Sequence, residues 1–256
     1  MLQPNSINNN KNAKKTSDFY DTLIINATVI DGSGATGEKK DVALKDDNIA
    51  AIGQLSSKRA TVTIDAEGLT LAPGFIDVHT HDDLEVLRNP KMFNKISQGV
   101  TSVIIGNCGI SATPYRSKSP LVDPINLLGD MNEFIFPQLK DYIDQFNPIR
   151  PHVNVAALVG HTSLRAQVMT DLTKPANSIE IEQMTNLLNE ALSQGAKGLS
   201  SGLAYNNANA APYSEIASLV EQLKHFDAIY TTHLRTEFDG IIEALDEAFN
   251  IIRSEL

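Results

Sequence analysis

Two histidines separated by one residue end an apolar stretch, and this spacing is the strongest chemical signal in the sequence. His79 and His81 lie in the run GFIDVHTHDD. If the residues before them form a strand, side chains two positions apart share one face, so both imidazoles can bind one divalent ion. The alternative is a pair of ordinary loop residues, but the preceding apolar run favours a metal. Asp82 and Asp83 follow directly and are expected to orient the pair or cap the next segment.

A cysteine and two further histidines also follow apolar runs. Cys108 lies in GNCG, where the glycines permit a sharp turn and a thiolate could join the imidazoles on zinc. His233 ends the run YTTH and shares a face with Arg235, whose guanidinium can bind a carboxylate through two hydrogen bonds. His161, in GHTSLR, can contact substrate, support a ligand or cap the next segment. The structural alternatives are an inert buried cysteine, a core histidine and a surface arginine.

Two other motif matches are interpreted as coincidental. Gly32–Gly37 fits the dinucleotide-binding pattern GxGxxG, but strand-like residues follow it instead of a helix, which predicts a hairpin turn. Gly198–Gly202 fits GxSxG with Ser200 as nucleophile, and Asp227 and His233 follow in the order of a serine hydrolase. The residues after this serine are loop-like, which disfavours a serine hydrolase that uses Ser200.

The chain that must position these residues has two regions with different patterns of predicted secondary structure. Short β-branched runs between residues 22 and 65 predict a small β unit. From residue 71, strand-like and helix-like stretches alternate, which predicts a parallel sheet, either a barrel or a doubly wound sheet. The predicted strands of this second region are Gly74–His79, Thr101–Gly106, Val153–Gly160, Gly198–Leu203 and Ile229–His233. Its clearest helix begins at Ser178, with Asn177 as N-cap and Glu180 completing a capping box.

Length and composition limit the function classes. A complete eight-unit barrel takes roughly 250 residues, whereas residues 71–256 number 186, so a barrel here has about five βα units. The net charge of −10 disfavours nucleic acid and anionic membranes as partners. One cysteine excludes an intrachain disulfide, and we find neither a spanning segment nor a secretory signal. A cytoplasmic location is expected.

The runs GFIDVHTHDD, GNCG, GHTSLR, GLSSGLAY and YTTHLRTE occur in this order, and with them the chain resembles the N-acyl-D-amino-acid deacylases (D-aminoacylases). These enzymes belong to the metal-dependent amidohydrolase superfamily. The paired histidines indicate the superfamily, and Cys108 is the narrower marker. Hydantoinases and dihydroorotases instead use a carboxylated lysine after the fourth strand, where this chain has Ser200 to Leu203.

The resemblance implies a fold, and together with the composition of the first residues it gives a division of the chain. The fold is α/β, a partial (β/α)8 TIM barrel of about five βα units preceded by a small β-sandwich portion. The expected divisions are a disordered tail at 1–18, the N-terminal β-sandwich portion at 19–70 and the barrel portion at 71–256.

The resemblance also implies site residues. The ligands of one or two zinc ions would be His79, His81, Cys108 and His233. Tyr205, in the GLxY segment, would polarise the scissile carbonyl. Arg235 and His161 are expected to contact substrate, which for Arg235 is our own inference from its position.

The implied activity is hydrolysis of the amide bond in N-acyl-D-amino acids, which releases a carboxylate and a D-amino acid. Family members have a further ligand histidine after strand six and a catalytic aspartate after strand eight. This chain stops before both, so we expect it to be incomplete or inactive alone, with a complementing C-terminal-half chain or self-association as partner. The alternatives are a non-catalytic metal-binding remnant or another amidohydrolase, such as a hydantoinase-like or dihydroorotase-like enzyme.

Overall fold

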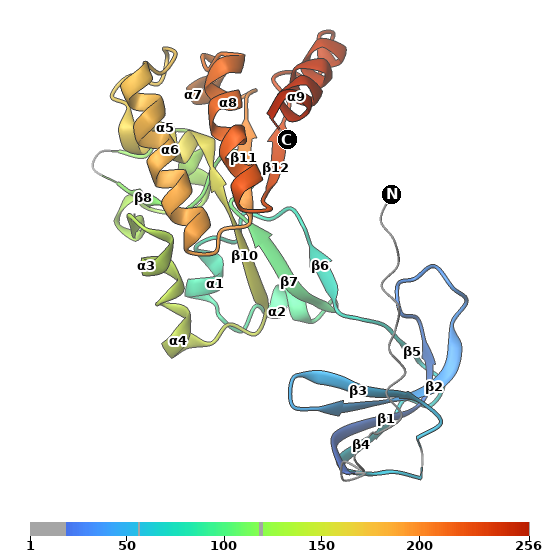
Figure 1. Ribbon diagram of the computed structural model, residues 1–256. Helices are drawn as coiled ribbons and strands as arrows, with labels where there is room; N and C mark the ends of the chain where they lie inside the picture. The colour runs from blue at the N-terminus through green and yellow to red at the C-terminus, as the bar shows by residue number, and fades with distance from the viewer. Residues whose placement is uncertain (1–18, 56, 118–119, 256) are drawn as a thin grey trace. The chain divides into compact units, whose positions relative to one another are not determined.

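The computed structural model describes residues 19–55, 57–117 and 120–255 of the chain. These residues belong to two compact units, Met1–Pro73 and Gly74–Leu256 (Figure 1). The tail predicted for residues 1–18 lies outside the described residues. No helix in the described part of the chain is long and apolar enough to cross a membrane.

The first unit is a five-stranded sheet in its described residues. Its strands are β1 (Phe19–Val29), β2 (Glu38–Lys45), β3 (Asn48–Gly53), β4 (Arg59–Asp65) and β5 (Thr70–Leu71). The order is β3-β2-β1-β4, and β5 pairs with Thr28 and Val29 of β1, past the part of β1 that pairs with β4. β1 runs antiparallel to β2 and parallel to β4, so the glycine-rich segment Gly32–Gly37 connects a hairpin, as predicted.

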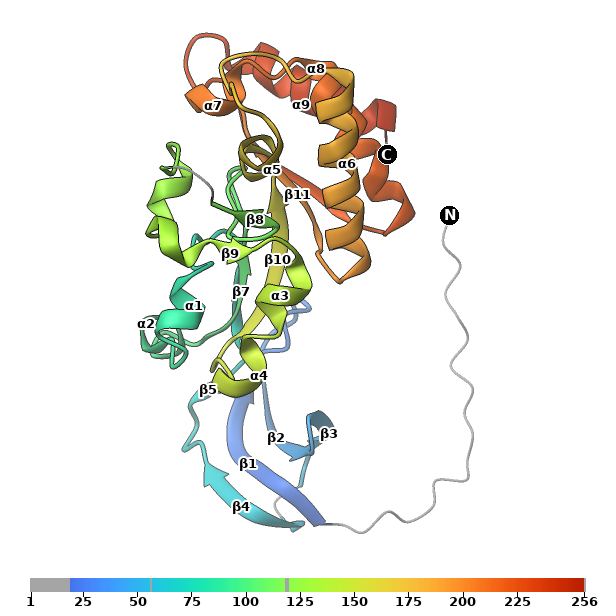
Figure 2. The ribbon, with the colours of Figure 1, turned by 90° about the vertical axis from the view of Figure 1, so that its left-hand side faces the viewer.

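The second unit contains a five-stranded parallel sheet, counted over the described residues. Its strands are β6 (Phe75–Asp77), β7 (Val100–Ile105), β10 (Asn154–Gly160), β11 (Gly198–Gly202) and β12 (Ile229–His233). Their order is β12-β11-β10-β7-β6, so each strand pairs with the strand of this sheet that comes before or after it in the sequence. This succession of parallel neighbours, curled along the sheet, is that of a partial TIM barrel and confirms the predicted fold class (Figure 2).

Helices cover this sheet and bury its core. The main ones are α5 (His161–Val168), α6 (Ser178–Ser193), α8 (Tyr213–Val220) and α9 (Ile241–Glu255). α6 packs beside α5 and α8, and α8 packs beside α9 (Figure 1). The Asn177 side chain accepts hydrogen bonds from the amides of Ile179 and Glu180, which confirms the predicted cap. Met184, Leu188 and Leu192 form the buried stripe of α6.

Shorter elements, which the sequence patterns do not predict, connect these parts. Most of them lie between the strands β6 and β10. The short helices are α1 (Glu85–Arg88), α2 (Phe93–Ile96), α3 (Leu139–Ile143), α4 (Phe146–Ile149) and α7 (Asn206–Asn209), with single turns η1 (Ile125–Leu127), η2 (Met131–Glu133) and η3 (Glu221–His225). The strands β8 (Tyr115–Arg116) and β9 (Ile135–Phe136) form a small antiparallel pair.

The parallel sheet has two open edges. Among the described residues, β6 pairs only with β7 and β12 pairs only with β11. Large apolar side chains are exposed on and beside both edge strands, among them Phe75 and Ile76 on β6 and Ile229 on β12. Unpaired parallel edges with exposed apolar groups are surfaces on which further strands can add.

Candidate metal centre

The predicted ligands gather at the carboxyl ends of three strands. β6 ends at Asp77, two residues earlier than the strand predicted from the sequence ends, so His79 and His81 lie in the loop after it. They still share a side, because the Thr80 between them is buried and its amide and hydroxyl both donate to the Ile104 carbonyl of β7. Cys108 follows β7, and His233 is the last residue of β12.

Three of the four predicted ligands form a compact group. One ligand atom each of His79, His81 and Cys108 lies within 4.8 Å of the other two. His79 Nε2 is 3.0 Å from Cys108 Sγ. His233 Nδ1 is 4.0 Å from the same sulfur and lies outside the compact group. Cys108 is thus the centre on which side chains from three strands converge.

The electrostatics of the group suit a metal ion. Burial, and secondarily the charge of His79, lowers the pKa of His81, which favours the neutral imidazole that binds metals. Burial raises the pKa of the Cys108 thiol, so without a cation the thiol stays protonated. Two imidazoles and one thiol form a nitrogen and sulfur donor set of the kind zinc prefers, and zinc binding deprotonates the thiol. The residues present therefore fit zinc.

Tyr205 reaches the same place from β11. It is the residue before α7, and its hydroxyl lies 3.4 Å from His233 Nδ1, with the two rings 5.1 Å apart. A Cβ at Gly202 would lie 2.7 Å from the Tyr205 ring and 2.2 Å from the Cys108 carbonyl oxygen. Only glycine leaves room there for the close approach of both residues. Burial raises the pKa of Tyr205, so its hydroxyl remains a proton donor.

Arg235 and His161 are held by carboxylates of the protein. Arg235 donates through Nε and Nη2 to Glu247 at 2.9 and 2.7 Å, and through Nη1 to the Asn209 carbonyl at 2.7 Å. His161 opens α5, is fully buried, and its Nε2 lies 2.9 Å from Glu215 Oε1. Their contact with substrate stays a prediction, and the structure brings neither into the histidine–cysteine group.

Two acidic groups lie near the site: Glu237, which has no distinct signal in the sequence, and Asp83, which is expected to orient the histidine pair or cap the next segment. Glu237 is exposed and places Oε1 3.6 Å from His233 Nε2, four residues before it in the sequence. Asp83 is fully buried and accepts hydrogen bonds from the amides of Gly106 and Ala112, which joins the histidine segment to the cysteine loop. Burial raises the pKa of Asp83 to about 6, although these two amides lower it.

Ser200 is not placed as a nucleophile. It is fully buried in β11, and its hydroxyl donates to the Gly106 carbonyl at 2.5 Å and accepts from the Gly109 amide at 3.0 Å. A nucleophilic serine must present its hydroxyl to substrate at a strand-to-helix turn. This geometry argues against the serine hydrolase hypothesis.

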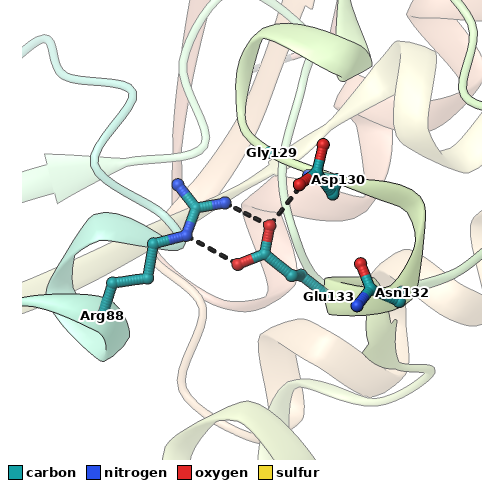
Figure 3. Close-up of a pocket in the computed structure, with 5 residues that line it drawn as sticks. All are labelled: Arg88, Gly129, Asp130, Asn132 and Glu133. Atoms are coloured by element: carbon teal, nitrogen blue, oxygen red, sulfur yellow. Dashed lines mark hydrogen bonds and ion pairs between the residues drawn. The ribbon is translucent and has the colours of Figure 1, made fainter.

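A separate polar pocket of about 510 Å³ lies away from the predicted residues. Figure 3 shows its lining residues, which are Arg88, Gly129, Asp130, Asn132 and Glu133. Arg88 Nε donates to Glu133 Oε1 at 2.6 Å, and Glu133 also accepts from the Asp130 amide at 2.8 Å. Since Arg88 and Glu133 pair with each other and none of the predicted ligands lines it, this pocket is not the candidate site.

The fold and the site define a protein class: a parallel (β/α) barrel sheet that gathers nitrogen and sulfur ligands at the carboxyl ends of its strands. The sequence profile of the amidohydrolase family matches residues 62–250, and the chain belongs to this family. It is 43% identical to the D-aminoacylase of Alcaligenes xylosoxydans xylosoxydans over 94% of this chain and 50% of that protein. The chain therefore spans about half the length of the curated relatives it matches.

Solved structures agree with this assignment. The N-acyl-D-glutamate deacylase of Bordetella bronchiseptica, complexed with zinc and a phosphonate inhibitor, matches with a TM-score of 0.88 and 38% identity, over 92% of this chain and 49% of that one. The L-hydantoinase of Arthrobacter aurescens matches with a TM-score of 0.50 and 18% identity, over 91% and 44%. The second likeness extends to the fold alone, so the hydantoinase-like alternative is distant.

Proposed function

We propose that this chain forms the metal-binding half of a zinc-dependent hydrolase that acts on N-acyl-D-amino acids. The observation that carries the proposal is the convergence of His79, His81 and Cys108 within 4.8 Å, in a chain similar to a D-aminoacylase. The products would be a carboxylate and a D-amino acid.

His79, His81, Cys108 and His233 would hold one or two zinc ions. A bound zinc ion supplies Lewis-acid polarisation of a carbonyl and lowers the pKa of water to about 7. The other contributions come from the chain itself. The imidazole of His81, whose neutral form is favoured by burial, offers a lone pair, and the buried thiol of Cys108 releases its proton on binding.

Tyr205 would bind the carbonyl oxygen of the scissile amide. Its hydroxyl stays protonated and lies beside His233, at the same end of the sheet as the metal ligands. A donor already in place stabilises the negative charge that develops on this oxygen without having to reorganise. The substrate contacts predicted for His161 and Arg235 remain part of the proposal, and the carboxylates of Glu215 and Glu247 would fix these two side chains in place.

The general base is not among these residues, and the resemblance assigns it to strands beyond the fifth. The open edges at β6 and β12 can accept such strands. The proposal therefore includes further polypeptide that pairs with these edges, whether it continues this chain or belongs to a complementing partner.

The test measures zinc content and hydrolysis of N-acetyl-D-methionine and N-acetyl-D-glutamate against their L forms. The protein is purified alone and with the C-terminal half of a D-aminoacylase. We expect stoichiometric zinc in both samples and D-selective turnover only in the second.

Matched variants make this test specific. His79→Ala should remove zinc, whereas His152→Ala changes an exposed histidine outside the group and should not. Absence of zinc from the unsubstituted protein would refute the metal site. Zinc without turnover in the completed protein would instead support the non-catalytic alternative.

A further inference from the structure

The loop that carries Cys108 adopts a backbone conformation that must be held in place. Cys108 has φ +54° and lies between Gly106 at +77° and Gly109 at +76°. L-residues other than glycine rarely adopt positive φ, and cysteine gains nothing locally from doing so. The direction of the Cys108 side chain thus depends on contacts that stabilise the loop from outside.

Ser200 contacts both ends of this loop with one hydroxyl. Its Oγ donates to the Gly106 carbonyl at 2.5 Å and accepts from the Gly109 amide at 3.0 Å. The serine is fully buried, and it is 94 and 91 residues away from these partners in the sequence. Because water cannot replace a buried partner, loss of this hydroxyl would leave a carbonyl and an amide unsatisfied.

The next residue on the strand provides a natural comparison. Ser201 is equally buried, but its Oγ lies 2.7 Å from the Tyr230 hydroxyl and 2.8 Å from the Thr232 hydroxyl. Successive side chains on a strand point to opposite faces. The two serines therefore have the same size and burial and lie on the same strand, but of the two it is the Ser200 hydroxyl that contacts the cysteine loop.

We propose that Ser200 is a positioning residue that sets the place and direction of the Cys108 sulfur for metal binding. It holds the Gly106–Gly109 loop at a fixed width by donating to one end and accepting from the other. Asp83 assists from the opposite side through the Gly106 amide. This inference rests on the proposed function, because it assigns Ser200 a part in building the same metal centre.

The test compares Ser200→Ala with Ser201→Ala in the full chain. Three readouts are measured: zinc affinity by chelator competition, the near-ultraviolet thiolate band of the cobalt-substituted protein, and the reaction rate of the metal-free thiol with a disulfide reagent. Cys108 is the only cysteine in the sequence, so the last two readouts report on it alone. Ser200→Ala should weaken zinc binding by about 10-fold or more, reduce the cobalt–thiolate band and change the thiol reaction rate.

The control defines what would overturn the proposal. Ser201→Ala should leave all three readouts unchanged. Equal changes in both variants, or no change in either, would overturn the positioning role. If the parent protein binds no metal, the proposed function fails, but the thiol rates of the two variants still decide whether Ser200 holds the loop.

A measurement on the unsubstituted protein covers the case in which Ser200→Ala does not fold. The Gly109 amide donates to the buried Ser200 hydroxyl, so it should exchange with deuterium as slowly as amides in the sheet. Rapid exchange of this amide would overturn the proposal.

Discussion

The substitution Glu215→Gln tests whether a buried ionic cluster stabilises the helices around the site. Glu215 Oε1 accepts from Arg165 Nη1 at 2.5 Å and from His161 Nε2 at 2.9 Å, and its Oε2 accepts from the Ala176 amide at 3.0 Å. The three side chains are fully buried. The cluster joins α5, α8 and the segment before α6.

The expected loss of stability follows from the Arg165 charge that remains buried. Glutamine keeps the shape of Glu215 but leaves the Arg165 guanidinium buried without a counter-charge and turns a donor toward existing donors. Removing one partner of a buried pair costs about 3–5 kcal/mol of unfolding free energy. At about 2–4 °C per kcal/mol for a domain of this size, the melting temperature should fall by roughly 6–20 °C.

A matched control separates this effect from the loss of any acidic group. Glu221 pairs with Lys224 at 3.1 Å on the surface, and Glu221→Gln should change stability by no more than about 0.5 kcal/mol. Urea and thermal unfolding, followed by circular dichroism at equal protein concentration, compare the two variants with the parent. The reasoning would be refuted if the unfolding free energy of Glu215→Gln lay within about 1 kcal/mol of that of Glu221→Gln.

Three further predictions follow from the same structure. Hydrogen bonds from His161, the Ala176 amide and Arg165 outweigh burial and lower the pKa of Glu215 from 4.5 to about 2. A depressed acid pKa adds stability above the unfolded value, so this stability should be lost between about pH 4.5 and 2, and acid titration of Glu215→Gln should lack the loss. Gly202→Ala should weaken zinc binding, because its Cβ would meet the Cys108 carbonyl. Gly195→Ala has open space around it but φ +110°, so it should strain its own turn and leave zinc binding unchanged; chelator competition measures both. The isolated chain should self-associate through its open edges, and sedimentation showing a monodisperse monomer at all concentrations would contradict this.

Most of the fold could be predicted from local sequence patterns. β7 and β10 are predictable because each is a short, mostly apolar run, and α6 is predictable because its cap and stripe lie within one window. The helix α5 was not predicted, and it begins at His161, directly after β10 and without an intervening loop. The segment between Cys108 and β10 has short elements whose positions depend on tertiary packing, which no periodicity records.

The candidate site was predictable to the extent that its residues follow strands. Parallel strands bring their carboxyl ends to one edge, which places the residues that follow them near one another. The residue patterns alone left Cys108 and His233 open to structural alternatives, and the resemblance to the deacylases grouped them with His79 and His81. The partners of Ser200 and Glu215 could not be predicted, because each contact joins residues far apart in the chain. GxSxG suggested a nucleophile at Ser200, whereas the structure uses this hydroxyl to hold a backbone loop.

The two histidine contacts of Cys108 close loops of very different length. Cys108 meets His79 across 29 residues and His233 across 125 residues. The entropic cost of closing the longer loop exceeds that of the shorter by roughly 1 kcal/mol. The loops after the first two strands of the parallel sheet can therefore bring three predicted ligands together at the lower cost, whereas His233 arrives only when the fifth strand has docked. A metal ion held by all of them would tie the first strand to the last, so its retention would report that every strand between them is in place.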